Sequence, residues 1–194
     1  MHKVADDGWF SGAEVCATSH FNARPPGESI SLLVIHNISL PPGQFGGKHV
    51  QRFFTGQIDP AGHPYFSEIA HLRVSAHFLI ERDGAVTQFV SCLNRAWHAG
   101  DSRYARRSDC NDFSIGVELE GTDDEPYSAD QYSALVELTC ALRKAYPDIT
   151  PGRITGHEFI APGRKTDPGP GFDWHHYLRC VTGHAVPGQQ ESLP

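Results

Sequence analysis

The segment that most constrains the fold is a short aliphatic run closed by a histidine. Between Ser31 and His36 every residue is Leu, Val or Ile. Such a run is typical of a strand buried on both faces, which needs a covering layer on each side. Because ligands gather at strand ends in open sheets, His36 is a candidate site residue. The alternative is a buried histidine whose ring nitrogens make hydrogen bonds within the core and bind no ligand.

Turn and cap signals around other apolar runs predict the remaining elements. Asp83-Gly84 supplies the positive φ angles of a tight hairpin. Ser128 and Gln131 form a capping box that begins a helix, and Pro147 ends it. Pro60 and Gly62 are among the breakers that make 56–66 irregular and mobile in this interpretation. The expected strands are 31–36, 77–81, 86–90, 113–119 and a last one at 154–157, and the expected helices are 48–55, 128–146 and 173–181.

These elements predict an α/β fold with a central mixed β-sheet flanked by helices. With 194 residues, the chain is long enough for one well-buried core. No repeat, low-complexity block or linker divides it. We therefore expect one domain over 8–182, followed by a flexible, polar C-terminal tail at 183–194.

Strand 113–119 and the residue that follows it carry two acids whose positions raise a first functional alternative. Alternation places Ser114, Gly116, Glu118 and Glu120 on one face and Phe113, Ile115, Val117 and Leu119 on the other. Glu118 and Glu120 are then about 7 Å apart, a spacing that formally suits an inverting glycosidase. Both acids point the same way from one strand instead of flanking a sugar bond. The glycosidase alternative therefore ranks low.

Charge and apolar content exclude several kinds of partner. The formal net charge is −7, so we expect no nucleic-acid partner. One small basic cluster, Arg103, Arg106 and Arg107, is an exception to this acidic character. It either binds an anionic ligand or is exposed to solvent. No apolar run is long enough to cross a bilayer, and residues 1–7 lack a signal-peptide stretch. A soluble, monomeric protein without a membrane partner is expected.

Cysteine usage points to a reducing compartment. The five cysteines are odd in number, widely spread and without a Cys-x-x-Cys pair. This pattern favours reduced thiols over a disulfide framework or a sulfur-ligated metal. We therefore expect a cytoplasmic location.

Two histidines and an aspartate form the strongest chemical constellation. His36 and His157 each end an apolar run, and Asp167 precedes a Pro-Gly-Pro turn. Two imidazoles and one carboxylate are a usual protein share of a catalytic zinc site. Taken singly, each residue has an alternative as a core histidine or a turn-capping carboxylate. A zincin helix, a nucleophile elbow and a phosphate-binding loop are all missing from the sequence.

Six segments together carry a resemblance to a known family. They are 31–43, 70–77, 95–100, 110–123, 156–157 and 164–170. These motifs resemble the AmpD-type 1,6-anhydro-N-acetylmuramyl-L-alanine amidases, zinc enzymes of bacterial cell-wall recycling. The similarity runs from about Gly8 to Trp174, which is nearly the whole chain. The fold that it implies is the α/β fold of the amidases and peptidoglycan-recognition proteins.

The resemblance implies a role for each matching residue. It implies that His36, His157 and Asp167 bind one Zn²⁺ per chain. It assigns Glu118 as general base and Lys165 as the cation that faces the developing oxyanion, although strand geometry leaves Glu120 as a rival base. The positions that match substrate-contact regions are Asn37, Arg73, Trp97, His98, Ala99 and Arg107.

One position departs from the family pattern. Asp109 stands where an arginine typically precedes Cys110. Arg106 or Arg107, slightly upstream, is the candidate to bind the stem-peptide carboxylate instead.

The implied substrate is a small soluble anhydro-muropeptide, cleaved between its sugar and L-alanine. Two alternatives remain open. A binding module of the same fold would usually lack a zinc ligand or the oxyanion cation, and both are present here. An exported relative that cuts intact cell wall would need an export signal.

Overall fold

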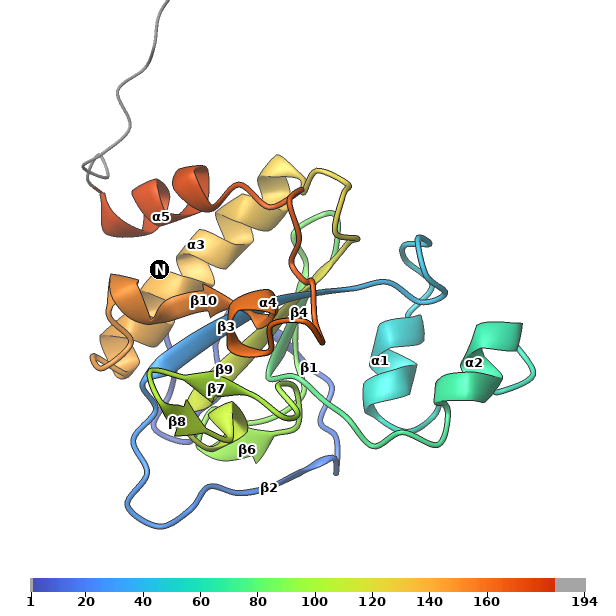
Figure 1. The fold of residues 1–194 in the computed structure, drawn as a ribbon, viewed down its shortest axis with the longest axis horizontal. Helices are drawn as coiled ribbons and strands as arrows, with labels where there is room; N and C mark the ends of the chain where they lie inside the picture. The colour runs from blue at the N-terminus through green and yellow to red at the C-terminus, as the bar shows by residue number, and fades with distance from the viewer. Residues whose placement is uncertain (1, 184–194) are drawn as a thin grey trace, which may run out of the picture.

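A computed structural model of the chain describes residues 2–183 and shows a central six-stranded sheet (Figure 1). The strands, in sheet order, are β1 (Glu14–Val15), β5 (Val86–Gln88), β4 (Phe78–Ile80), β9 (Ser114–Glu120), β3 (Leu32–Ile38) and β10 (Ile154–Gly156). Only β4 and β5 pair antiparallel, so the sheet is mixed. The prediction of a mixed sheet flanked by helices is confirmed.

Helices α3 (Ala129–Ala145) and α5 (Trp174–Thr182) cover one face of this sheet (Figure 1). Ser128 begins α3 with the predicted capping box, in which its side chain and that of Gln131 exchange hydrogen bonds with the backbone. Leu135, Leu138 and Leu142 then pack on the sheet in the main hydrophobic core. Burying one such leucine contributes roughly 1.5–3 kcal/mol, so this apolar face anchors the sheet.

Short elements cover the opposite face. They are α1 (His49–Phe54), α2 (Pro64–Ile69), α4 (His157–Ile160), the 3-10 turn η1 (Cys110–Asp112) and two small antiparallel sheets, whereas a second 3-10 turn, η2 (Pro151–Arg153), contacts α5. One small sheet pairs β2 (Phe21–Ala23) with β6 (Asn94–Ala96), and the other pairs β7 (Arg103–Tyr104) with β8 (Arg107–Ser108). Helices α1 and α2 project to one side of the sheet (Figure 1).

Strands β3 and β9 set the floor of the site. Both are buried along the sheet, and their register places His36 beside Glu118. The predicted alternation holds for β9, because Ile115 and Val117 pack with α3 while the acids face the other side. Phe113 is the exception: it ends η1 instead of joining the strand, and its ring packs on the site-side face.

Segment 56–66 was incorrectly predicted to be irregular throughout. Helix α2 begins at Pro64, where the missing N–H of proline costs nothing because first-turn N–H groups have no helical partner. The His63 ring caps this helix by accepting a hydrogen bond from the Tyr65 N–H. Of the predicted tail, residues 184–194 lie outside the described residues. No helix within residues 2–183 has both the length and the apolar character to cross a membrane.

Candidate metal centre and active site

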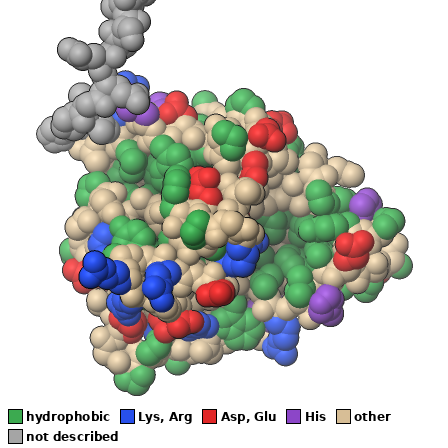
Figure 2. Space-filling view, in the orientation of Figure 1, with side chains coloured by type: hydrophobic (Ala, Val, Ile, Leu, Met, Phe, Trp, Pro, Cys, Tyr) green, Lys and Arg blue, Asp and Glu red, His purple; other side chains and the backbone are tan. Residues whose placement is uncertain are grey.

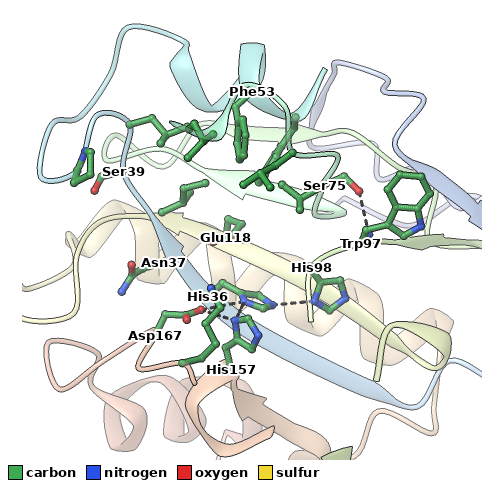
Figure 3. A pocket seen from close by; sticks show the side chains of 18 of the residues that line it. His36, Asn37, Ser39, Phe53, Ser75, Trp97, His98, Glu118, His157 and Asp167 are labelled. Carbon is green, nitrogen blue, oxygen red and sulfur yellow. Dashed lines mark hydrogen bonds and ion pairs between the residues drawn. The ribbon is translucent and has the colours of Figure 1, made fainter. Parts of the chain in front are cut away.

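Three side chains from separate elements meet at one end of the sheet (Figure 3). His36 lies near the end of β3, His157 begins α4 directly after β10, and Asp167 lies in the loop that leads to α5. The two Nδ1 atoms are 2.9 Å apart, and each is 3.0 Å from Oδ2 of Asp167. His36 and His157 are 1% and 2% exposed, so their ring nitrogens cannot rely on bulk water. The structure thus brings together all three predicted metal ligands.

The donor set fits a bound cation. Ligands about 2.0–2.1 Å from a tetrahedral zinc lie about 3.3 Å from one another, close to the separations seen here. Each Nδ1 atom faces both the other Nδ1 atom and Oδ2 of Asp167, so one cation could contact all three atoms at once. Burial lowers the pKa of His36 to about 4, which disfavours the positively charged ring. The His36–His157–Asp167 group could therefore hold a metal ion.

Asp167 carries the negative charge of this group. Burial raises its pKa, but the hydrogen bonds from His157 and His36 outweigh this and hold the pKa well below its ordinary value. Its side chain remains 13% exposed at the cavity wall. The carboxylate therefore stays ionised and available as a ligand across the physiological pH range.

Glu118 is the buried acid nearest to this group. It is 8% exposed, and its Oε2 atom has no hydrogen-bond partner. Burial, followed by the negative charge of Asp167, raises its pKa well above the ordinary value, while Lys165 opposes the shift. A buried carboxyl group with a raised pKa and a free oxygen is a candidate general base.

Glu120 has a different environment, although it lies on the same strand face. Its Oε1 accepts a hydrogen bond from the Gly46 N–H at 2.5 Å, and its Oε2 accepts one from the Arg82 N–H at 3.3 Å. Both carboxylate oxygens of Glu120 thus accept hydrogen bonds from loop backbone N–H groups, and Glu120 does not line the cavity. These contacts favour Glu118 over Glu120 as the base.

A cavity of about 390 Å³ opens above these groups (Figure 3). The metal-ligand cluster, Glu118 and Lys165 form one wall. The opposite wall is apolar and comes largely from α1, α2 and the segment after α2, with Phe53, Tyr65, Ile69, Leu72 and Val74. Apolar side chains surround the corresponding hollow in the space-filling view (Figure 2). The cavity therefore combines one wall of candidate metal ligands and charged side chains with an opposite apolar wall.

Three predicted substrate contacts, Asn37, Trp97 and His98, line this cavity. The Asn37 amide already donates to Oδ1 of Asp123 at 2.8 Å and to the Pro168 carbonyl at 3.2 Å. It therefore fixes the loop that carries Asp167. The Trp97 Nε1–H donates to Oδ1 of Asn22 at 2.6 Å, which holds the indole at the rim of the cavity.

His98 and Ala99, also predicted as substrate contacts, touch the ligand histidines. Nδ1 of His98 lies 2.9 Å from Nε2 of His36, and the Ala99 carbonyl lies 3.1 Å from Nε2 of His157. His98 occupies the space beside Gly116, where a Cβ atom would come within 2.4 Å of its ring. Both residues contact the predicted metal ligands directly.

Arg73 and Arg107 do not line the cavity. Arg73 is exposed after α2. Arg107 pairs with Glu28 and lies 4.0 Å above the Phe113 ring. Basic side chains, Arg103, Arg106 and Arg107 among the exposed ones, gather on the β7–β8 side of the molecule (Figure 2).

Several supporting residues were missed from the sequence. Asn111 accepts hydrogen bonds from the backbone N–H groups of His98 and Ala99, and Arg164 donates to the Ala99 carbonyl. Asn22 is 75 residues from Trp97. Asn111 and Arg164 lie inside the family-like segments 110–123 and 164–170, which was a signal, whereas Asn22 had none, since contacts across such separations have no local pattern.

A cluster of two histidines and a carboxylate beside a buried acid, at the strand ends of a mixed sheet, defines an α/β hydrolytic enzyme with a candidate metal centre. The family model described as "N-acetylmuramoyl-L-alanine amidase" matches residues 26–170. The chain belongs to this amidase family, and within it to the AmpD type; it is a hydrolase that acts on an amide bond.

Relatives support this placement over almost the whole length. The 1,6-anhydro-N-acetylmuramyl-L-alanine amidase AmpD of Escherichia coli K12 is 56% identical over 92% of this chain and 97% of its own length. A crystal structure of a selenomethionine AmpD derivative superposes with a TM-score of 0.87 at 56% identity, covering 91% and 97% of the two chains. AmpDH3 of Pseudomonas aeruginosa, in complex with anhydromuramic pentapeptide, gives a TM-score of 0.63 at 30% identity, covering 80% and 61%.

Proposed function

We propose that this chain is a zinc-dependent amidase that hydrolyses the bond between 1,6-anhydro-N-acetylmuramic acid and the L-alanine of the stem peptide in soluble muropeptides. The observation that carries the proposal is the donor triangle of His36, His157 and Asp167 on the wall that also contains Glu118. His36, His157 and Asp167 would hold one zinc ion. When bound, zinc supplies a Lewis acid that lowers the pKa of water and polarises a carbonyl group.

Glu118 moves the proton in this mechanism. Its unpartnered Oε2 can accept a proton from the attacking water, whose oxygen then bonds to the amide carbon. As the C–N bond breaks, the same carboxyl group delivers the proton to the leaving nitrogen of L-alanine. Transfer by a positioned acid or base of this kind typically contributes 10²–10⁴-fold in rate.

Lys165 supplies the positive charge on the same wall. Its ammonium group is exposed to the cavity and acts electrostatically on Glu118. We assign it to the negative charge that develops on the carbonyl oxygen, where loss of one donor typically costs about 3–4 kcal/mol.

The apolar wall and Trp97 would receive the sugar and its lactyl side, with Asn37 at the metal-side rim. The stem-peptide carboxylates would meet Arg73 and Arg107 outside the cavity. Support for the anhydro sugar comes from the names of the relatives: the Escherichia coli relative is a 1,6-anhydro-N-acetylmuramyl-L-alanine amidase, and AmpDH3 has been solved with anhydromuramic pentapeptide.

A place in cytoplasmic muropeptide recycling is part of the proposal. The five cysteines are all free thiols in the structure, which suits a reducing compartment. The net charge of −7 gives little attraction to an anionic wall polymer.

Equal molar amounts of anhydro-muropeptide and intact sacculi test the substrate assignment. Chromatography should show stem peptide released from the anhydro fragment and far less from sacculi, and a chelator should abolish both. Comparable cleavage of the two substrates would remove the recycling assignment and leave the amidase chemistry standing.

A further inference from the structure

The two ligand histidines present their second ring nitrogens to one dipeptide. His36 points Nε2 at Nδ1 of His98, 2.9 Å away, and His157 points Nε2 at the carbonyl oxygen of Ala99, 3.1 Å away. His98 and Ala99 are consecutive in the chain, whereas the two ligands are 121 residues apart. A single backbone segment therefore contacts both histidines on the side opposite Asp167.

This segment is itself held by buried groups. Oδ1 of Asn111 accepts hydrogen bonds from both backbone N–H groups, of His98 at 3.1 Å and of Ala99 at 2.8 Å. Asn111 is 5% exposed, so water does not compete strongly for this oxygen. Arg164 also donates to the Ala99 carbonyl at 2.7 Å. These hydrogen bonds hold the segment through groups other than the two ligand histidines.

Hydrogen-bond directions follow from the ligand role of the histidines. When Nδ1 of His36 faces the metal, its neutral ring carries the proton on Nε2 and donates it to Nδ1 of His98. The proton of His98 must then be on Nε2, which lies 3.1 Å from the Ser114 hydroxyl oxygen. Ser114 is completely buried and is the acceptor at the end of this chain. With a metal on Nδ1 of His36, one tautomer of each of these two rings satisfies the contacts of this chain.

The local sequence makes room for the arrangement. Gly116, two residues after Ser114 on the same face of β9, has no Cβ where one would come within 2.4 Å of the His98 ring. Any larger residue there would push His98 away from His36. Glycine at this position in a buried central strand is otherwise unfavourable, because it adds no packing.

From these contacts we infer that His98 and Asn111 are positioning residues of the metal centre: they fix the ring orientation and tautomer of His36 and His157 so that both Nδ1 atoms face Asp167. Asn111 does not line the cavity, and His98 lines it while its Nδ1 atom faces His36. His98 thereby takes a different role from the substrate contact that the resemblance implies. The inference rests on the proposed zinc centre, since tautomer and orientation matter only if the Nδ1 atoms bind a metal.

The test is zinc affinity, measured by competition with a chromophoric chelator on full-length protein. His98→Leu removes the acceptor for His36 and should weaken zinc binding about 10–100-fold, as loss of such outer contacts typically does. His98→Asn can place an amide oxygen where Nδ1 lies and should restore most of the affinity. Unchanged affinity in His98→Leu would overturn the inference.

A second pair of variants covers the case in which His98→Leu does not fold. Asn111→Ala should weaken zinc binding, whereas Asn111→Asp keeps an acceptor oxygen and should lose less. Equal affinity of these two variants and wild type would overturn the role of Asn111. In zinc-loaded wild type, the ring-nitrogen NMR spectrum should show His98 protonated on Nε2 only. A proton on Nδ1 would contradict the proposed chain of hydrogen bonds.

The zinc centre has its own control, His157→Ala. If wild type binds no zinc, or this variant binds it as tightly, the proposed metal centre is wrong. If wild type binds and His157→Ala does not, but the His98 and Asn111 variants match wild type, only the positioning role is wrong.

Discussion

Replacing Glu118 should have opposite effects on activity and on stability. The perturbation is Glu118→Met, which keeps the length of the side chain and removes the carboxyl group. Loss of the general base should lower the rate of the zinc-loaded enzyme by about 10²–10⁴-fold. The same change removes a buried carboxyl oxygen that has no partner in the structure.

The size of the stability effect follows from that unpartnered atom. A buried polar group without a hydrogen bond costs about 1–3 kcal/mol, and Glu118 is only 8% exposed. The metal-free variant should therefore gain about 1 kcal/mol or more in the free energy of unfolding. For a domain of this size, each kcal/mol raises Tm by about 2–4 °C.

Glu120→Met is the matched control, because it makes the same change two residues away on the same strand. It removes the acceptor of the Gly46 and Arg82 N–H groups, so it should cost about 1–3 kcal/mol. Its effect on rate should be small by comparison. Thermal unfolding of metal-free protein and initial rates with zinc measure both effects. A stabilised, inactive Glu120→Met beside an active, destabilised Glu118→Met would refute the assignment of the base.

Three further variants address other parts of the site. Lys165→Met should keep full zinc content and lose at least about a hundredfold in rate, and a near-normal rate would remove the oxyanion role. Asn22→Ala frees the Trp97 indole and should raise KM more than it lowers kcat; an unchanged KM would mean that the ring does not contact substrate. His77 is buried, and burial lowers its pKa to about 3, so folding excludes its charged form. The neutral His77 ring therefore contributes to the free energy of unfolding above about pH 6.5. This contribution is lost as pH falls towards 3, and the free energy of unfolding then changes by at most about 1.4 kcal/mol per pH unit. His77→Asn should flatten the acid side of the stability–pH curve, and an unchanged slope would show that His77 does not cause it.

The parts of the fold that could be predicted depend on local signals. The apolar run that becomes β3 and the capping box of Ser128 act within a few residues, and both were predicted correctly. Strands β1, β2, β6, β7 and β8, of two or three residues each, were missed, because pairs such as β2 with β6 form only through distant partners. Helix α2 was missed because a proline that breaks a helix interior is also a favoured first residue.

The site residues divide in the same way, into those with a local sequence signal and those that depend on distant contacts. Metal-binding residue types at the ends of apolar runs singled out His36 and His157, since strand ends meet at one edge of a sheet. The contact between His98 and His36 depends on the missing side chain of Gly116 on a neighbouring strand. The difference between Glu118 and Glu120 depends on which loop backbone reaches each carboxylate. Neither feature can be predicted from spacing along one strand.

The central claim is that one zinc ion, held by His36, His157 and Asp167, makes this chain an anhydro-muropeptide amidase. Its most direct test is to strip the protein with a chelator and titrate zinc back while following the release of stem peptide. Activity should be absent from the stripped protein and rise linearly to a plateau at one zinc per chain. Undiminished cleavage by stripped protein, or a plateau only at two or more ions, would contradict the claim.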